Sequence, residues 1–254
     1  MTFFPEFVKP LNEITLKAGE IIMGFYKKDL DITIKDDKSP VTQADIAANN
    51  FIVEELRKLT PNLPIVAEES KNIKISNNKA NFWLVDPIDG TKSFIKRTGE
   101  FTVNIGLIYN GVPTMGAIFI PAKDVLYYTS GMEIAEKRSA NEKSKKIVVR
   151  KKPAAGYTVV ASESHRTKET DDFISGLDKV EKLVSASSSI KLCLVAEGSA
   201  DVYPRFGPTC EWDIGAGHAI LRAAGGRLVT DNGENLKYGK PDYLNGNFIA
   251  WGNC

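Results

Sequence analysis

Two long apolar runs, residues 101–109 and 112–120, are separated only by the dipeptide Asn110–Gly111. Asn-Gly readily adopts the left-handed conformations of a two-residue turn, so the two runs predict a pair of antiparallel strands. Shorter apolar runs at residues 65–67, 83–85 and 125–129 predict further strands. The first half of the chain is therefore expected to contain a β-sheet.

Two amphipathic helices are predicted before these strands. Apolar residues recur every three or four positions between Phe7 and Tyr26. A second helix is expected from Thr42 to about Leu59, where the prolines that follow end it. Its inner face is expected to carry Ile46, Phe51, Ile52 and Leu56.

The second half of the chain shows alternating strand and helix patterns. Residues 137–152 are rich in charge and poor in aromatic residues, which predicts a surface connection. Beyond it, alternation is typical of helices packed on a mixed sheet. We expect an N-terminal α+β half, residues 1–145, and a C-terminal α/β half, residues 146–254. The elements predicted in the latter are strands 157–161, 180–185, 202–206 and 227–230, and helices 167–177, 189–197 and 213–224.

Composition excludes several classes of function. The chain has 254 residues, and 33 Lys+Arg against 32 Asp+Glu give a net charge of +1, so nucleic acid is not an expected partner. Three cysteines without C-x-x-C spacing predict neither a disulfide framework nor a zinc cluster, and favour the cytoplasm. No apolar run is long enough for a transmembrane segment, and no secretory signal is recognisable.

The most informative segment is residues 83–91, in which an apolar strand ends in Asp86 and Asp89, followed by Gly90 and Thr91. Strand ends are where open sheets present chemical groups. Further acidic residues, Glu68–Glu69 and Glu211-x-Asp213, follow two other apolar runs. The alternative is that Asp-Pro and Asp-Gly, which are common turn dipeptides, only reverse the chain.

Carboxylates that come together repel one another unless a cation neutralises them, and a ligand set of oxygens alone favours Mg²⁺ acting with a substrate phosphate. Free backbone N–H groups near Gly90 and Thr91 could receive an anion. Asp45 fits both a capping box with Thr42 and a catalytic role, and spacing does not separate them. Of the two histidines, His165 and His218, the second is expected to be packed.

These residues resemble a known family, the magnesium-dependent, lithium-sensitive phosphomonoesterases that include inositol monophosphatase, fructose-1,6-bisphosphatase and 3′(2′),5′-bisphosphate nucleotidase. The resemblance covers nearly the whole chain and implies a layered α/β/α/β/α sandwich. Within the family, the chain looks most like the bacterial bisphosphate nucleotidases of the CysQ type, which remove the 3′-phosphate of adenosine 3′,5′-bisphosphate. The superfamily motifs are residues 41–45, 67–70, 83–91 and 211–218, and those of the branch are residues 92–97, 99–105, 194–198 and 203–208.

The resemblance implies two or three Mg²⁺ ions. Glu68, Asp86 and the carbonyl of Ile88 would hold one ion, and Asp86, Asp89 and Asp213 a second. The implied catalytic residues are Asp45, Thr91 and Glu68, with Thr91 activating the attacking water through its bond to Asp45. The implied substrate-binding residues are Asp89, Gly90, Thr91, Ser189, Lys191, Arg205 and Asp213.

One motif departs from the branch, whose Gly-Ser-Ser-Leu-Lys pattern stands here as Ser187–Lys191 without the glycine. Lys191 and Arg205 are the candidates for binding a second phosphate, and the alternative is that both are solvated surface charges. Other functions left open are an inositol or sugar phosphatase and a non-catalytic nucleotide-binding module. Association with the inner membrane and the oligomeric state are also left open.

Overall fold

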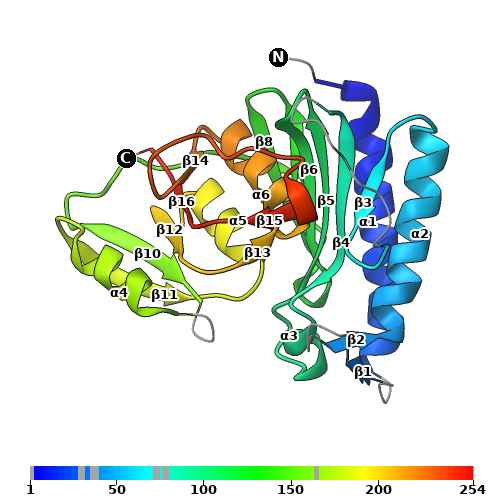
Figure 1. Ribbon diagram of the computed structural model, residues 1–254, viewed down its shortest axis with the longest axis horizontal. Coiled ribbons are helices and arrows are strands. Elements are labelled where there is room, and N and C mark those ends of the chain that lie inside the picture. Colours follow the sequence, from blue (N-terminus) through cyan, green and yellow to red (C-terminus); the bar gives the residue numbers. More distant parts are fainter. Residues whose placement is uncertain are drawn as a thin grey trace.

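The computed structural model describes residues 3–27, 32–34, 40–70, 75, 80–162 and 166–253. Read from right to left, Figure 1 shows five layers. Helices α1 (Pro5–Tyr26) and α2 (Gln43–Leu59) form the first layer and α5 (Ile190–Ala196) and α6 (Glu211–Ala223) the third, while α4 (Lys168–Ser175) is outermost. A seven-stranded and a five-stranded sheet lie between them, which confirms the α/β/α/β/α sandwich.

The larger sheet has the strand order β3-β4-β5-β6-β7-β8-β9. Only β3 and β4 run parallel, and every other neighbouring pair is antiparallel. Asn110 and Gly111, both with positive φ, join β5 to β6, as the hairpin signal predicts. The strands are β3 (Ile65–Ala67), β4 (Phe82–Asp89), β5 (Thr102–Tyr109), β6 (Val112–Ile120), β7 (Val125–Gly131), β8 (Ile134–Ser139) and β9 (Lys145–Ile147).

The predicted surface connection at residues 137–152 is wrong in its first part, because β8 and β9 extend the sheet there. Ala135 and Ile147 pair across these two strands and are buried, while Lys145 and Lys146 are exposed. Charged side chains on the exposed face of an edge strand hide the strand pattern from a sequence reading. The division of the chain after residue 145 falls inside β9 and stays a prediction.

Helices α1 and α2 cover one face of the larger sheet, where they pack on buried side chains of β4 and β5 such as Trp83 and Ile105. The inner face of α2 differs from the prediction at one position, because Ile46 is 49% exposed. Asp45 and Asn49 are buried on that face. The apolar pattern therefore missed two polar residues that turn toward the sheet.

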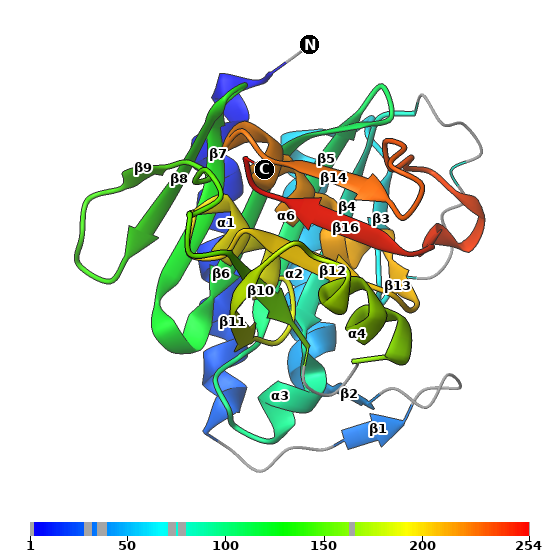
Figure 2. The ribbon, with the colours of Figure 1, turned by 90° about the vertical axis from the view of Figure 1, so that its left-hand side faces the viewer.

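The smaller sheet has the order β11-β10-β12-β16-β14 and faces the viewer in Figure 2. The strands and helices predicted beyond residue 157 are confirmed to within two residues at each end. The short strand β16 was not predicted; it lies antiparallel between β12 and β14. The strands are β10 (Tyr157–Ala161), β11 (Val180–Ser185), β12 (Val202–Arg205), β14 (Arg227–Thr230) and β16 (Phe248–Trp251).

Small elements complete the described fold. Two antiparallel ribbons, β1 with β2 and β13 with β15, lie outside the two sheets. No helix in the described residues combines the length and apolar character needed to cross a lipid bilayer. The bounds are β1 (Ile32–Ile34), β2 (Pro40–Thr42), α3 (Thr91–Ile95), β13 (Thr209–Cys210), β15 (Leu244–Asn245) and the 3₁₀ turns Pro121–Lys123 and Pro241–Tyr243.

Helix α6 lies between the two sheets and touches the larger one over two glycines. A Cβ atom on Gly116 would lie 2.3 Å from the backbone oxygen of Ala216, and one on Gly106 would lie 2.7 Å from its nitrogen. Real Cβ atoms are not found this close to backbone, so only glycine permits this packing. The contact fixes the height of α6 above β5 and β6, and hence the place where the helix begins.

Candidate active site

The acidic segments singled out in the sequence meet at one cleft of about 350 Å³. Residues of β4, of the short helix α3, and of α5 and α6 line it. The cleft is lined by ten of the residues that the resemblance implied: Glu68, Asp86, Ile88, Asp89, Gly90, Thr91, Ser189, Lys191, Arg205 and Asp213.

The end of β4 has the irregular geometry that a binding site needs. Its pairing with β5 shifts register between Asp86 and Asp89. Gly90 follows with φ of 94°, and a Cβ atom there would lie 3.1 Å from the carbonyl oxygen of Glu100. The left-handed glycine turns the chain directly from the strand into α3, which begins at Thr91.

Burial and like charges act together on the carboxyl groups. Burial raises the pKa of Asp86 well above its usual value, and the charges of Glu68, Asp89 and Asp213 raise it further. Burial likewise raises the pKa of Asp213, to which Asp89 and Glu68 add. The cleft therefore holds more negative charge than its surroundings neutralise.

The donor set fits a hard cation. All the donors are oxygens, and Oδ1 of Asp86 is buried with no hydrogen-bond partner among the described residues. Within the same residues, no group of three or more acidic, histidine or cysteine side chains is arranged so that it could hold a metal ion by itself. An open set of this kind suits Mg²⁺, which keeps several waters and shares its coordination with substrate phosphates.

Asp45 makes the contacts of both roles that the sequence left open. Its Oδ2 accepts hydrogen bonds from the backbone N–H and the hydroxyl of Thr42, at 2.8 and 2.6 Å, and so caps α2. Its Oδ1 faces the Thr91 hydroxyl at 3.3 Å, and the carbonyl oxygen of Ile88 is a second acceptor for that hydroxyl at 3.2 Å. Capping thus places Asp45 where it can act on Thr91.

Asp89 is held by polar groups that the sequence reading did not single out for this role. Its Oδ2 accepts from the backbone N–H of Ser189 at 2.7 Å and from the amide of Asn104 at 3.3 Å. The Ser189 hydroxyl in turn donates to Asn104 at 2.8 Å and contacts the Thr102 hydroxyl at 2.9 Å. The available signal was a pair of polar residues, 102 and 104, at alternate positions of an otherwise apolar strand.

The loop in which Ser187 stands in place of the branch's glycine contains a left-handed residue at the next position. Ser188 has φ of 58°, while the backbone N–H of Ser187 donates to the carboxylate of Glu100 at 3.1 Å. The carbonyl oxygen of Ser188 accepts from the Lys191 ammonium group at 2.7 Å. A serine at 187 is therefore compatible with the described loop.

Lys191 is not a solvated surface charge, because only 5% of it is exposed. Its ammonium group lies over the Tyr203 ring at 5.1 Å, and burial lowers its pKa to about 8. Arg205 donates to the carbonyl oxygen of Pro208 at 3.0 Å, and its buried Nε has no partner within the described residues. Both cations line the same cleft as the carboxylates.

His218 does not line this cleft. His218 is buried in α6, where its Nδ1 lies 2.9 Å from the Tyr238 hydroxyl. Burial lowers its pKa to about 3, so it is neutral at physiological pH. This confirms the expectation that His218 is packed, while His165 lies outside the described residues.

Comparison with known proteins identifies the family of the chain. Residues 6–253 match the inositol monophosphatase family. Two relatives named 3′(2′),5′-bisphosphate nucleotidase CysQ, from Salmonella typhimurium and Buchnera aphidicola, are 43% and 42% identical; the alignments cover 93% and 94% of this chain and 96% and 91% of theirs. The crystal structure of CysQ from Bacteroides thetaiotaomicron, 39% identical, has a TM-score of 0.84 over 99% of both chains. The chain therefore belongs to the inositol monophosphatase family.

Proposed function

We propose that this chain is a Mg²⁺-dependent 3′(2′),5′-bisphosphate nucleotidase that hydrolyses the 3′-phosphate of adenosine 3′,5′-bisphosphate to give AMP and phosphate. The relatives that carry this name support the proposal over almost the full length of the chain. The observation that carries it is the presence in one cleft of a carboxylate cluster and two cations, Lys191 and Arg205. A substrate with two phosphates uses both halves of such a cleft.

In this proposal Glu68, Asp86 and the carbonyl of Ile88 would hold one Mg²⁺, and Asp86, Asp89 and Asp213 would hold another. Bound there, Mg²⁺ neutralises charge on the phosphate and makes water more acidic. The proposal is for two or three such ions in the active site. The buried Asp86 oxygen, which has no hydrogen-bond partner among the described residues, supports the assignment of Asp86 as a metal ligand.

The chain's own residues then divide the work. Asp45 accepts the Thr91 proton at Oδ1, which leaves the Thr91 oxygen free to take a proton from the attacking water. We assign to Glu68 a share in orienting that water. The backbone N–H groups of Gly90 and Thr91, at the start of α3, receive the oxygens of the reacting phosphate.

Lys191 and Arg205 bind the second phosphate through charge-assisted hydrogen bonds, with Ser189 positioned beside them by Asn104. A compact inositol phosphate has no second phosphate for these cations. The low cysteine content, three in 254 residues, supports a location in the cytoplasm as part of the proposal.

Parallel turnover assays test the function. Phosphate release is measured from adenosine 3′,5′-bisphosphate, 3′-AMP and inositol 1-phosphate, each with Mg²⁺ and with a chelator. We expect the highest kcat/KM for the bisphosphate and loss of activity with the chelator. A higher kcat/KM for inositol 1-phosphate would identify the chain as an inositol phosphatase of the same family, and turnover of none would favour a binding module.

A further inference from the structure

The orientation of Asp213 depends on how the first turn of α6 is held. Asp213 is the third residue of the helix, and its Oδ2 accepts the backbone N–H of Cys210 at 2.8 Å. This capping contact ties the carboxylate to the backbone that enters the helix. Any group that fixes residues 210–213 therefore also fixes where the other Asp213 oxygen can meet a cation.

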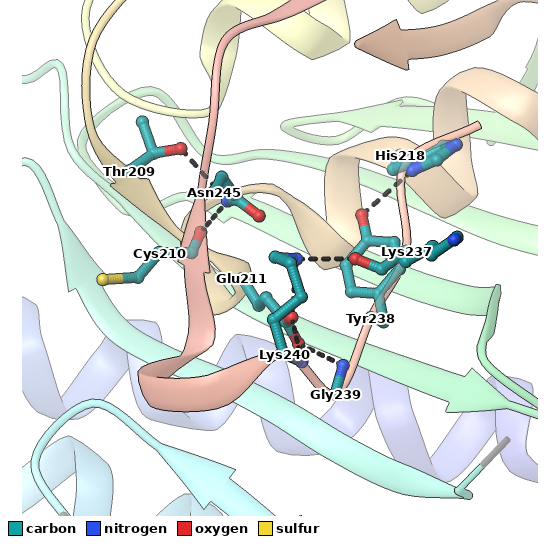
Figure 3. A network of polar contacts seen from close by, with 9 residues as sticks. All are labelled: Thr209, Cys210, Glu211, His218, Lys237, Tyr238, Gly239, Lys240 and Asn245. Carbon is teal, nitrogen blue, oxygen red and sulfur yellow. Dashed lines mark hydrogen bonds and ion pairs between the residues drawn. The ribbon is translucent and has the colours of Figure 1, made fainter. Parts of the chain in front are cut away.

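Glu211, the first residue of α6, is such a group. It is fully buried, although it is a charged side chain that does not line the cleft. Its Oε2 accepts the backbone N–H of Gly239 at 2.9 Å, and its Oε1 accepts the backbone N–H and the ammonium group of Lys240 at 2.9 and 2.6 Å. Figure 3 shows the Lys240 side chain folded back onto the carboxylate.

Residues 237–245, the segment that contains Gly239 and Lys240, contact the start of α6 at further points. The Asn245 amide donates to the carbonyl oxygen of Cys210 at 2.7 Å and to the Thr209 hydroxyl at 3.1 Å, beside the β13–β15 pairing (Figure 3). Farther along α6, Tyr238 meets His218. Residues 237–245 therefore hold α6 from its entry strand to its middle.

We propose that Glu211, together with Lys240, is a positioning residue for the cation site. It does not touch the cation; it locks the first turn of α6 so that Asp213 is pre-oriented for binding. Groups that orient a metal ligand typically change metal affinity by tenfold to a hundredfold when removed. This inference rests on the Mg²⁺-binding role proposed above for Asp213.

The test compares two buried carboxylates that differ in location. Glu211→Gln keeps the side-chain volume and a carbonyl oxygen but removes the charge. Asp201→Asn is the matched control, because Asp201 is also fully buried, accepts the Thr158 N–H at 2.6 Å and pairs with Arg150 at 2.8 Å, yet does not line the cleft. Mg²⁺ binding without substrate is measured by calorimetric titration, and the thermal transition of each variant is recorded.

We expect Glu211→Gln to raise the Kd for Mg²⁺ about tenfold, whereas Asp201→Asn lowers the Tm and leaves the Kd within about twofold. At saturating Mg²⁺ the kcat of Glu211→Gln should recover. Equal loss of Tm in both variants with an unchanged Kd would overturn the proposal, because Glu211 would then be a purely structural residue.

Lys240→Met provides a second route, since it leaves the two backbone donors to Glu211 in place. We expect a smaller rise in Kd; if Glu211→Gln does not fold, an unchanged Kd in Lys240→Met overturns the proposal. The proposed function fails separately. A chain whose Mg²⁺ affinity depends on Glu211 but which does not hydrolyse the bisphosphate supports this inference alone, whereas absence of Mg²⁺ binding contradicts both.

Discussion

Asp89 shows how a single carboxylate is prepared for binding by its neighbours. Ser189 and Asn104 donate to one of its oxygens, so the side chain is oriented before any ligand arrives. Burial nevertheless raises its pKa, and the charge of Lys191 only partly opposes this. Asp89 is thus oriented for binding, while the burial of its charge lowers the stability of the fold. Groups in such strained environments are typical of functional sites.

Asp89→Asn should therefore abolish most turnover without loss of the fold. The amide oxygen can still accept the bonds from Ser189 and Asn104, and the variant removes a buried negative charge from a crowded site. We expect kcat to fall by about 100-fold or more, as for the loss of one preorganised electrostatic group, while the Tm of the Mg²⁺-free protein stays equal or rises. Asp178→Asn, at an 85% exposed side chain, is the control. A joint loss of Tm and activity would make Asp89 a structural residue.

Lys191→Met tests the second-phosphate site. Methionine keeps most of the buried volume and loses the charge, so we expect KM for the bisphosphate to rise about tenfold to 100-fold. KM for 3′-AMP, which lacks the second phosphate, should not change. Lys123→Met, at an exposed position, should leave both unchanged. Equal effects of Lys191→Met on the two substrates would contradict the assignment.

The titration of Lys191 gives a pH signature. Its pKa of about 8 results mainly from burial, opposed by Asp89, Glu100 and Asp213 and reinforced by Arg205. Because the phosphate binds the charged form, KM for the bisphosphate should rise as the pH increases above about 8. The rise should be absent in Lys191→Met, which has nothing to titrate. A rise that persists in this variant would point to another group.

The acidic residues of the cleft could be predicted because Asp86 and Asp89 end an apolar strand within a rare motif. The groups that orient them could not. Thr102 and Asn104 lie in a strand whose apolar residues dominate its pattern, and their partner Ser189 is 85 or more positions away in the chain. Glu211 was noted as acidic, but nothing local indicates that its donors come from residues 239–240.

Among the elements, α6 depends most on close packing. Its backbone rests on Gly106 and Gly116, and it carries Asp213 into the cleft. Gly116→Ala places a methyl group against the oxygen of Ala216, so we expect a loss of about 1–3 kcal/mol in the free energy of unfolding and weaker Mg²⁺ binding. Urea denaturation measures the first effect and calorimetric titration the second.

The matched variant is Gly24→Ala in α1, where an added Cβ meets nothing within 4 Å. Alanine is the better helix former, so this variant should keep or gain up to about 1 kcal/mol. If Gly116→Ala were as stable as Gly24→Ala, α6 would have room to move away from the sheet without loss.

Elements whose own residues show a clear apolar or turn pattern could be predicted from the sequence. Elements that depend on contacts with distant parts of the chain could not. The hairpin at Asn110–Gly111 is decided by its own two turn residues. Strands β8 and β9 are edge strands with exposed charges, and β16 has only four residues. Its apolar side chain predicts that Ile46 faces inward, but it is Asp45 and Asn49 that are buried there.

For the whole molecule, the crowded carboxylates couple stability to pH and to Mg²⁺. The pKa values of Asp86 and Asp213 are raised in the folded state, so their contribution to stability is present at low pH and is lost as the pH rises through these raised values. A bound cation removes the repulsion. The Tm gained on adding saturating Mg²⁺, measured by calorimetry, should therefore increase as the pH is raised and these carboxyl groups lose their protons. A gain in Tm that is the same at every pH would contradict this coupling.

The order of layers was predictable only through the resemblance to a family, since alternation alone indicates helices on a mixed sheet. The position of α6 between the two sheets defines the order of the layers. This helix comes from the second half of the chain and covers the sheet of the first half.

This position of α6 determines the order in which parts of the fold can be completed during synthesis on the ribosome. Chains tend to fold from the N-terminus as they emerge, yet the sheet completed by residue 147 must wait, one face uncovered, until residue 223 has left the exit tunnel. The hydrogen bonds that the backbone N–H groups of Gly239 and Lys240 donate to Glu211 can form only later still. One face of the larger sheet is thus exposed in the nascent chain until the residues of α6, Glu211–Ala223, have been synthesised.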